Sequence, residues 1–138
     1  GRLEREKDLP TLLRAFAILR QGRDCRLFAF SNGSAEAVET LLGAAGIRDF
    51  FLGVVSCDDV RSFKPNPAVY AHFLRQAQAS GSETWLISGN PFDVIGAISA
   101  GMRGAWVQRS EDAIFDPWGI EPTVTVTSLR ELAGRILT

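Results

Sequence analysis

The stretch LISGNPFDVIGA, residues 86–97, contains the pattern that decides the fold of this chain. It opens with an apolar run typical of a buried strand, places Ser88, Asn90 and Asp93 within six positions, and continues with apolar residues at helical spacing. Asn90 followed by Pro91 favours a helix start, because asparagine caps a first turn and proline fits its first position. The stretch therefore predicts a strand, a polar turn and a helix, with Asp93 in the first helical turn.

The same alternation between strand-like runs and helical spacing continues along the chain. Strands separated by helices pair in parallel through right-handed crossovers, with helices on both faces of the sheet. We therefore predict an α/β fold built on a doubly wound parallel sheet. The predicted strands are residues 25–31, 51–56, 84–88 and 104–108, followed by a short extended piece at 123–126.

Start and end signals for the helices fall between those strands. Ser34 and Asn66 are predicted N-caps, and Ser128 with Glu131 predicts a capping box for a final helix. Glycines, which favour helix ends, predict where the helices stop. The apolar stripes are Leu9 to Leu19 before Gly22, Val38 to Ala45 before Gly46, Val69 to Ala77 before Gly81, and Val94 to Met102.

Composition narrows the class of protein. A chain of 138 residues with 46% hydrophobic residues can bury the core of one domain. Its 15 basic and 16 acidic residues leave a net charge of -1, so we expect neither nucleic acid nor a membrane as a partner. Cys25 and Cys57 stand in apolar surroundings, which predicts two buried thiols in a reducing compartment. No apolar run approaches the ~20 residues of a membrane span, and residues 1–10 are too charged for a signal peptide, so we expect a cytoplasmic protein.

Polar residues cluster at the carboxyl ends of the predicted strands, where ligands bind in an open parallel sheet. The first strand ends in Ser31 and Asn32, whose hydroxyl and amide can fix a carboxylate or phosphate oxygen. Lys64 follows the second strand and supplies a positive charge, and Asp93 is the carboxylate we expect nearest to it. The sequence thus predicts an anion site beside a carboxylate, which suits nucleophilic or general-base chemistry.

Each of these residues also has a purely structural interpretation. Residues 31–34 can form a turn and a helix cap, Lys64 can be a solvated surface charge, and Asp93 can cap its helix. A Cys–His hydrolase using Cys57 and His72 is less favoured, because His72 is expected to be a packed or exposed helical residue. The joint order of the polar residues at successive strand ends is what favours a site.

That joint order resembles the haloacid dehalogenase (HAD) superfamily, and within it the type II 2-haloacid dehalogenases. FSNGS at residues 30–34, KPNPAVY at 64–70 and SGNPFD at 88–93 are similar to its second, third and fourth motifs. The resemblance covers nearly the whole chain. Phosphatases of the superfamily carry an aspartate where Asn90 stands, to hold magnesium, so Asn90 favours the dehalogenase branch. We expect no cofactor on this resemblance, and magnesium only under the alternative of a magnesium-dependent phosphatase.

The resemblance implies a hydrolase that removes halide from a short 2-haloacid through an aspartyl ester, which water then hydrolyses. Lys64 would keep the nucleophilic carboxylate ionised, and Asp93 would position the hydrolytic water and brace Lys64. The implied partner is a small molecule, a 2-haloacid or another small carboxylate, and a homodimer stays open. The catalytic residues implied are Lys64, Asp93, Ser88 and Asn90, and the substrate-binding residues are Ser31 and Asn32.

Parts of the family pattern are not found in these residues. The family's nucleophile is an aspartate at the end of a central strand, followed by a helical cap, and none of the eight aspartates here has that setting. Only Asp58 follows a strand, in a stretch that carries no nucleophile in the family. We therefore expect residues 1–138 to be the C-terminal portion of a single core domain, with an incomplete sheet that lacks the nucleophile strand and the cap, and to be inactive alone. A non-catalytic binding protein on the same scaffold stays open as an alternative.

Overall fold

The computed structural model describes residues 25–108, 110–115 and 119–137. Strands and helices alternate along these residues, as the sequence predicts. The helix predicted before Gly22 lies outside the described residues. In chain order the elements are β1 (Phe28–Ser31), α2 (Ala35–Ala44), η2 (Arg48–Phe50), β2 (Gly53–Ser56), η3 (Cys57–Val60), α3 (Pro67–Ala77), η4 (Gly81–Glu83), β3 (Trp85–Ser88), α4 (Pro91–Ser99), β4 (Arg103–Val107), β5 (Val124–Val126) and α5 (Leu129–Leu137), where η marks a 3₁₀ helix.

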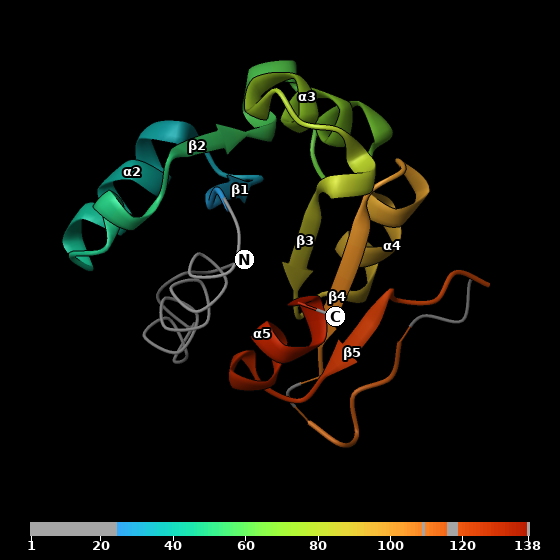
Figure 1. The fold of residues 1–138 in the computed structure, drawn as a ribbon. Coiled ribbons are helices and arrows are strands. Elements are labelled where there is room, and N and C mark those ends of the chain that lie inside the picture. The colour runs from blue at the N-terminus through green and yellow to red at the C-terminus, as the bar shows by residue number, and fades with distance from the viewer. Residues whose placement is uncertain (1–24, 109, 116–118, 138) are drawn as a thin grey trace.

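The described strands run parallel to their neighbours and form two separate sheets (Figure 1). β1 pairs with β2 in a register that places Ser31 opposite Ser56. β3 pairs with β4, and β4 with β5. Among the described residues no strand joins β1 to β3. The break falls between the strands that end in Ser31 and Ser88, in agreement with the predicted incomplete sheet.

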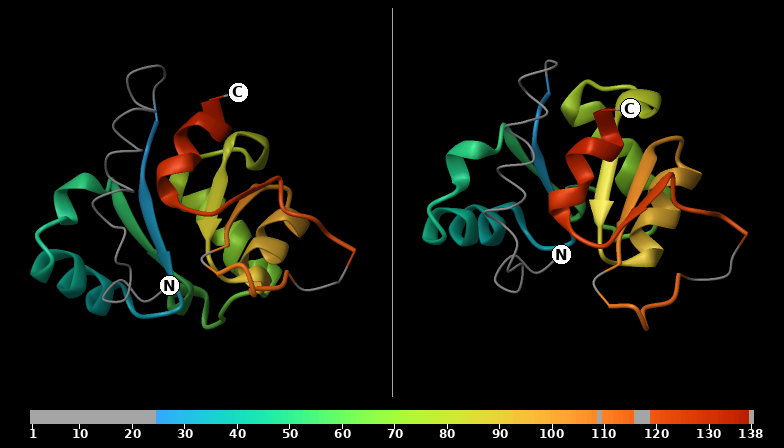
Figure 2. Two further views of the ribbon diagram at one scale, coloured as in Figure 1. Left: turned by 90° about the horizontal axis from the view of Figure 1, so that it is seen from below. Right: turned by 60° about the horizontal axis from the view of Figure 1, so that its bottom comes forward.

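Helices cover both faces of the strands, which confirms the predicted doubly wound arrangement (Figure 2). In β1, Phe30 joins the main core with α3 and α4, whereas Ala29 packs into a smaller cluster with α2. β4 repeats this alternation, because Trp106 joins the main core and Ala105 packs into a cluster with Leu132 of α5. Successive side chains of a strand point to opposite faces, so each strand needs a helix on either side.

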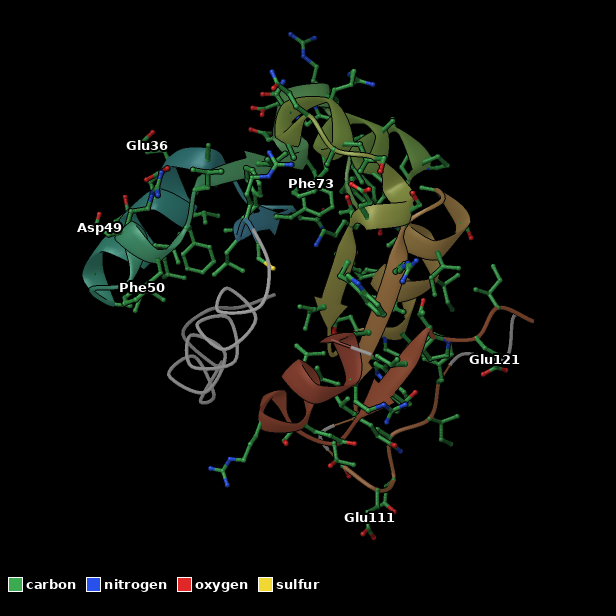
Figure 3. The ribbon with its side chains drawn as sticks, viewed as in Figure 1. Glu36, Asp49, Phe50, Phe73, Glu111 and Glu121 are labelled. Carbon is green, nitrogen blue, oxygen red and sulfur yellow. The ribbon has the colours of Figure 1, made fainter. Side chains whose placement is uncertain are left out.

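Aromatic side chains of β1 and α3 tie the first sheet to the main core. The ring of Phe73 lies 5.6 Å from that of Phe28 and 5.0 Å from that of Phe30, centroid to centroid. Phe73 is buried inside the fold, whereas Glu36 and Asp49 point away from it (Figure 3). α3 also contacts α4, which packs on β3 and β4. The two helices therefore bridge the break between the sheets.

The helix starts follow the predicted caps. Ser34 Oγ accepts the backbone N–H of Ala37 at 3.1 Å, at the start of α2. Asn66 Oδ1 accepts the backbone N–H of Ala68 at 2.9 Å, and Pro67 occupies the first turn of α3. Both caps satisfy backbone donors that have no partner within the helix, so these two predictions are confirmed.

Three details of the helix ends differ from the prediction. α3 ends at Ala77 with Gln78 in a left-handed conformation, whereas Gly81 opens the 3₁₀ helix η4. α4 ends at Ser99, so Met102 is a core residue beyond the helix. At α5, Glu131 Oε1 accepts the N–H of Thr127 at 2.9 Å, one residue before the predicted cap. Local hydrogen bonds set the end of α3 and the start of α5, and α4 stops before Gly101, which has a φ of +92°.

The two cysteines have different surroundings. Cys57 is fully buried, as predicted, but Cys25 is only half-buried. The reason is that β1 begins at Phe28, so Cys25 lies before the strand rather than within it. None of the helices that the structure describes is long and apolar enough to cross a membrane.

Candidate active site

Five of the six predicted site residues line one cavity of about 300 Å³. The sixth, Ser88, lies beside it, and its Oγ accepts the backbone N–H of Asn90 at 3.0 Å. The lining comes from the end of β1, the loop before α3 and the first turn of α4, so the cavity lies at the break between the two sheets. The lining residues are Ser31, Asn32, Gly33, Lys64, Asn90, Phe92 and Asp93.

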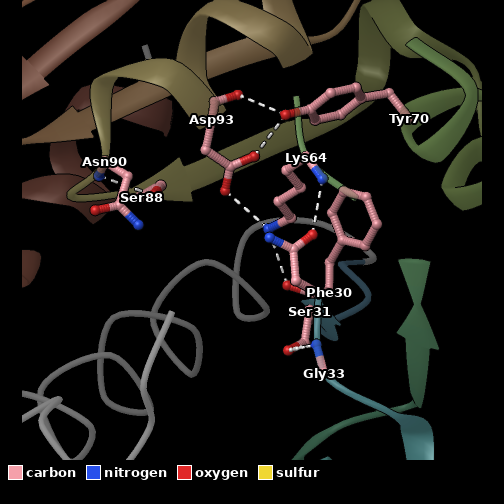
Figure 4. A network of polar contacts seen from close by, with 9 residues as sticks. Phe30, Ser31, Gly33, Lys64, Tyr70, Ser88, Asn90 and Asp93 are labelled. Carbon is pink, nitrogen blue, oxygen red and sulfur yellow. Dashed lines mark hydrogen bonds and ion pairs between the residues drawn. The ribbon is translucent and has the colours of Figure 1, made fainter. Parts of the chain in front are cut away.

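A buried ion pair joins the two sides of this cavity (Figure 4). Lys64 Nζ lies 2.8 Å from Asp93 Oδ2, and the two side chains are only 6% and 4% exposed. The same ammonium donates to the carbonyl of Phe30 at 3.0 Å and lies 4.3 Å from the centre of its ring. Lys64 is therefore not the solvated surface charge of the structural interpretation. An ammonium has three N–H donors, so one remains for a further acceptor in the cavity.

Tyr70 is a second partner of Asp93. Its hydroxyl donates to Asp93 Oδ1 at 2.8 Å and lies 3.3 Å from the Asp93 carbonyl oxygen. Tyr70 is fully buried, and this burial, followed by the nearby Asp93 carboxylate, raises the pKa of the phenol. The phenol therefore stays protonated as a donor. Both carboxylate oxygens of Asp93 are engaged by side chains rather than by the backbone of its helix.

Asn32 holds the backbone next to this ion pair. Its Oδ1 accepts the backbone N–H of Lys64 at 2.7 Å, across 32 positions of sequence. The bond links the end of β1 to the loop before α3, and so fixes where the Lys64 side chain begins. The amide nitrogen of Asn32 is the part of the side chain that can serve as a donor to a ligand.

Ser31 and Ser88 form the same kind of turn at the ends of two strands. Ser31 Oγ accepts the N–H of Gly33 at 3.0 Å, as Ser88 Oγ does for Asn90. Each hydroxyl keeps its own proton for donation to an acceptor. Asn90 is the N-cap residue of α4, but its side chain makes no capping hydrogen bond. Ser31 and Ser88 thus have the structural role of holding turns. The Asn90 side chain does not cap its helix and lies at the cavity wall.

Tyr70 and Phe92 belong to the site but are not among the residues predicted from the sequence. Tyr70 ends the KPNPAVY motif and follows the buried Val69, and a buried tyrosine needs a partner for its hydroxyl. That requirement could have marked Tyr70 as a polar contact, although not its partner Asp93. Phe92 lines the cavity and is 41% exposed. Its place in the sequence between Asn90 and Asp93 does not show that its ring faces the cavity.

The alternative Cys–His chemistry has no matching geometry. His72 is buried, and its Nε2 bonds to Asp59 Oδ2 at 3.1 Å. Burial raises the pKa of the Cys57 thiol, although the nearby Lys64 ammonium opposes this effect. A raised pKa disfavours the thiolate, which is the nucleophilic form of cysteine.

The donor set does not fit a magnesium site. Magnesium is held by oxygen ligands, usually one or two carboxylates and waters. Asp93 already accepts from Lys64 and Tyr70, and Asn90 offers a neutral amide in place of a second carboxylate. Within the described parts of the chain, no group of three His, Cys, Asp or Glu side chains comes together.

Comparison with known proteins defines the class. The family model described as haloacid dehalogenase-like hydrolase matches residues 2–101, so the chain belongs to that family. It is 35% identical over 106 residues to (S)-2-haloacid dehalogenase 2 of Pseudomonas sp. (strain CBS-3), covering 77% of this chain and 46% of that protein. It is also 31% identical over 111 residues to the pyrimidine 5'-nucleotidase YjjG of Escherichia coli (strain K12), covering 79% of this chain and 48% of that protein.

A solved structure agrees with the fold. The L-2-haloacid dehalogenase from Xanthobacter autotrophicus superposes with a TM-score of 0.81 at 25% identity. The match covers 96% of this chain and 60% of that one. The chain thus spans about half the length of the curated relatives it matches.

Proposed function

We propose that the whole protein is a hydrolase that releases halide from a short 2-haloacid through an aspartyl ester. The single observation that supports this most is the buried Lys64 ammonium, which is held by Asp93 and Phe30 and faces a cavity of polar side chains. The similarity to (S)-2-haloacid dehalogenase 2 also supports this activity, because that relative is named for it.

In the proposed reaction, the nucleophile is the aspartate that the family resemblance implies, not Asp93. One of its carboxylate oxygens attacks the α-carbon of the substrate from the side opposite the halogen. The carbon–oxygen bond forms while the carbon–halogen bond breaks, and the halide leaves with the electron pair. The third N–H of Lys64 is directed at the attacking carboxylate and keeps it ionised. Water, positioned or deprotonated by Asp93, then adds to the ester carbonyl carbon. The bond from that carbon to the ester oxygen breaks, the 2-hydroxy acid leaves with the proton on its new hydroxyl, and the aspartate carboxylate is regenerated.

The remaining residues recognise the substrate in this proposal. The Ser31 hydroxyl and the Asn32 amide nitrogen donate to the substrate carboxylate, since each is a donor at the cavity wall. Ser88 holds the turn that carries Asn90, and the two shape the far side of the pocket. The homodimer and the cytoplasmic location stay predictions.

We further propose that residues 1–138 alone do not turn over substrate. Asp93 is engaged by Lys64 and Tyr70, and none of the eight aspartates has the setting that the resemblance assigns to a nucleophile. Halide release from L-2-chloropropionate by the purified 138-residue chain, lost in the Lys64→Ala variant, would overturn this proposal.

A magnesium-dependent phosphatase is the second candidate, because one relative is a pyrimidine 5'-nucleotidase. The two candidates separate in one assay on a protein as long as its relatives. We expect halide release from L-2-chloropropionate that is unchanged by EDTA. Phosphate release from a nucleotide or another phosphate ester that requires added magnesium, without halide release, would favour the phosphatase.

A further inference from the structure

Gly96 of α4 lies directly against the phenol of Tyr70. A Cβ added at Gly96 would stand 2.5 Å from Tyr70 Oη, 2.7 Å from Cε2 and 2.8 Å from Cζ. Non-bonded heavy atoms pack at roughly 3.5–4.0 Å. The phenol therefore occupies the space that any side chain at Gly96 would need.

Tyr70 has little freedom to move away from such a side chain. It is fully buried in the main core, and its ring packs edge-on against Phe30 with centroids 5.7 Å apart. Its hydroxyl contacts both the carbonyl and Oδ1 of Asp93, which lies three residues before Gly96 on the same side of α4. A methyl group at Gly96 must push the hydroxyl out of this arrangement.

Backbone conformation does not explain why glycine stands at position 96, and comparison with a second helical glycine, Gly43, shows this. Neither Gly96 nor Gly43 has a positive φ, and each lies within a helix, where glycine is less favourable than alanine. A Cβ at Gly43 would meet nothing within 4 Å. Of these two helical glycines, Gly96 alone leaves space that a neighbouring side chain fills.

We propose that Gly96 is a positioning residue of the candidate active site: its missing side chain lets Tyr70 reach Asp93 and hold the carboxylate toward Lys64. Its importance for catalysis rests on the proposed function, whereas its effect on Tyr70 does not. The residue acts through Tyr70, because Gly96 itself has no group to offer a substrate.

The test follows the ionisation of Tyr70 by NMR in protein labelled with ¹³Cζ-tyrosine, with the Tyr70 signal identified by its loss in Tyr70→Phe. Tyr70 is the one tyrosine in these 138 residues. In the parent protein we expect the phenol to stay protonated past pH ~10, the ordinary value. Gly96→Ala should let the phenol begin to ionise at a lower pH than in the parent, because the hydroxyl moves away from the Asp93 carboxylate. The matched control Gly43→Ala should leave the titration at the parent value.

An unchanged Tyr70 titration in folded Gly96→Ala would overturn the proposal. If Gly96→Ala does not fold, the double variant Gly96→Ala/Tyr70→Leu decides, because leucine removes the ring that the methyl group meets. We expect the double variant to fold, with a urea midpoint close to that of Tyr70→Leu alone. A double variant that fails to fold as Gly96→Ala does, although Tyr70→Leu alone folds, would contradict the proposal. Neither measurement needs a substrate, so failure of the proposed function is a separate outcome.

Discussion

The buried network of Lys64, Asp93 and Tyr70 and the polar rim of Ser31, Ser88 and Asn90 belong to the same site but are built in different ways. The network is held by contacts between residues 23 and 29 positions apart. The serines of the rim form hydrogen bonds to backbone groups two positions away. The network therefore depends on the two sheets being correctly placed, whereas the rim depends mainly on local turns.

This difference determines what each region contributes. The network lies where the break between β1 and β3 leaves the sheets without a shared hydrogen-bonded edge, and its ion pair crosses that break. Removing one member of a buried ion pair leaves an uncompensated charge. The rim side chains reach solvent, so water can replace a lost partner. We expect network variants to change stability and activity together, and rim variants to change activity alone.

The largest expected effect is that of Asp93→Ala. It leaves the Lys64 ammonium buried without its carboxylate, at a cost of about 3–5 kcal/mol in the free energy of unfolding. Urea unfolding followed by tryptophan fluorescence measures it. The control is Lys64→Met/Asp93→Leu, which removes both charges and should recover most of the loss. A single variant as stable as the parent would mean that the pair is solvated.

Tyr70→Phe is expected to cost about 1–3 kcal/mol in the same measurement. The substitution keeps the ring and deletes the donor to Asp93 Oδ1, so a buried carboxylate oxygen loses a partner. An unchanged free energy of unfolding would mean that the Tyr70 hydroxyl does not hold the Asp93 carboxylate. Halide release by the whole protein should fall as well, because the Asp93 carboxylate is then held by Lys64 alone.

The stability advantage of the parent over the Tyr70→Phe variant should depend on pH. Folding raises the pKa of Tyr70 above its ordinary value, so the unfolded chain releases this proton first as pH rises. The advantage is therefore fully present below pH ~10 and shrinks above it, by up to about 1.4 kcal/mol per pH unit. Urea unfolding of both proteins from about pH 8 to about pH 11 measures whether this stability difference falls as pH rises. An advantage that grows with pH would contradict it.

The smallest effect on stability is expected from Ser31→Ala and Ser88→Ala. Each removes one exposed turn hydrogen bond, so the free energy of unfolding should change by only about 0.5 kcal/mol. Halide release by the whole protein should nevertheless fall roughly 10-fold or more if these residues contact the substrate or hold its pocket. Large destabilisation with unchanged activity would mean that these serines support the fold and do not serve the substrate.

The sequence predicts the rim better than the network, and the reason is physical. Caps and turns at Ser34, Asn66 and residues 88–90 are set by neighbours a few positions away, so they can be recognised from the sequence. The clustering of Ser31, Lys64 and Asp93 follows from parallel strands sharing one edge. The contact between Tyr70 and Asp93 depends on how α3 packs on α4, which no local pattern encodes.

The predicted end of α3 was wrong because residue type alone does not show which residue closes a helix. Gly81 is a reasonable stop for α3 by residue type, but the helix ends at Ala77 because Gln78 adopts a left-handed conformation. The N–H of Gln78 bonds to the carbonyl of Arg75, and that of Ala79 to the carbonyl of Leu74, which closes the helix. Gly81 is required elsewhere, since a Cβ there would lie 2.5 Å from the carbonyl oxygen of Gly101.

In the proposed function, the buried Lys64 ammonium serves halide displacement in the whole protein, so removing its charge should stop halide release. Halide release from L-2-chloropropionate is compared between the parent, Lys64→Gln and the control Gly43→Ala, in EDTA, with folding checked by circular dichroism. We predict release by the parent and the control, and a loss of at least about 100-fold in folded Lys64→Gln. Equal release by parent and Lys64→Gln would show that the ammonium does not serve displacement, and no halide release by the parent would refute the dehalogenase function.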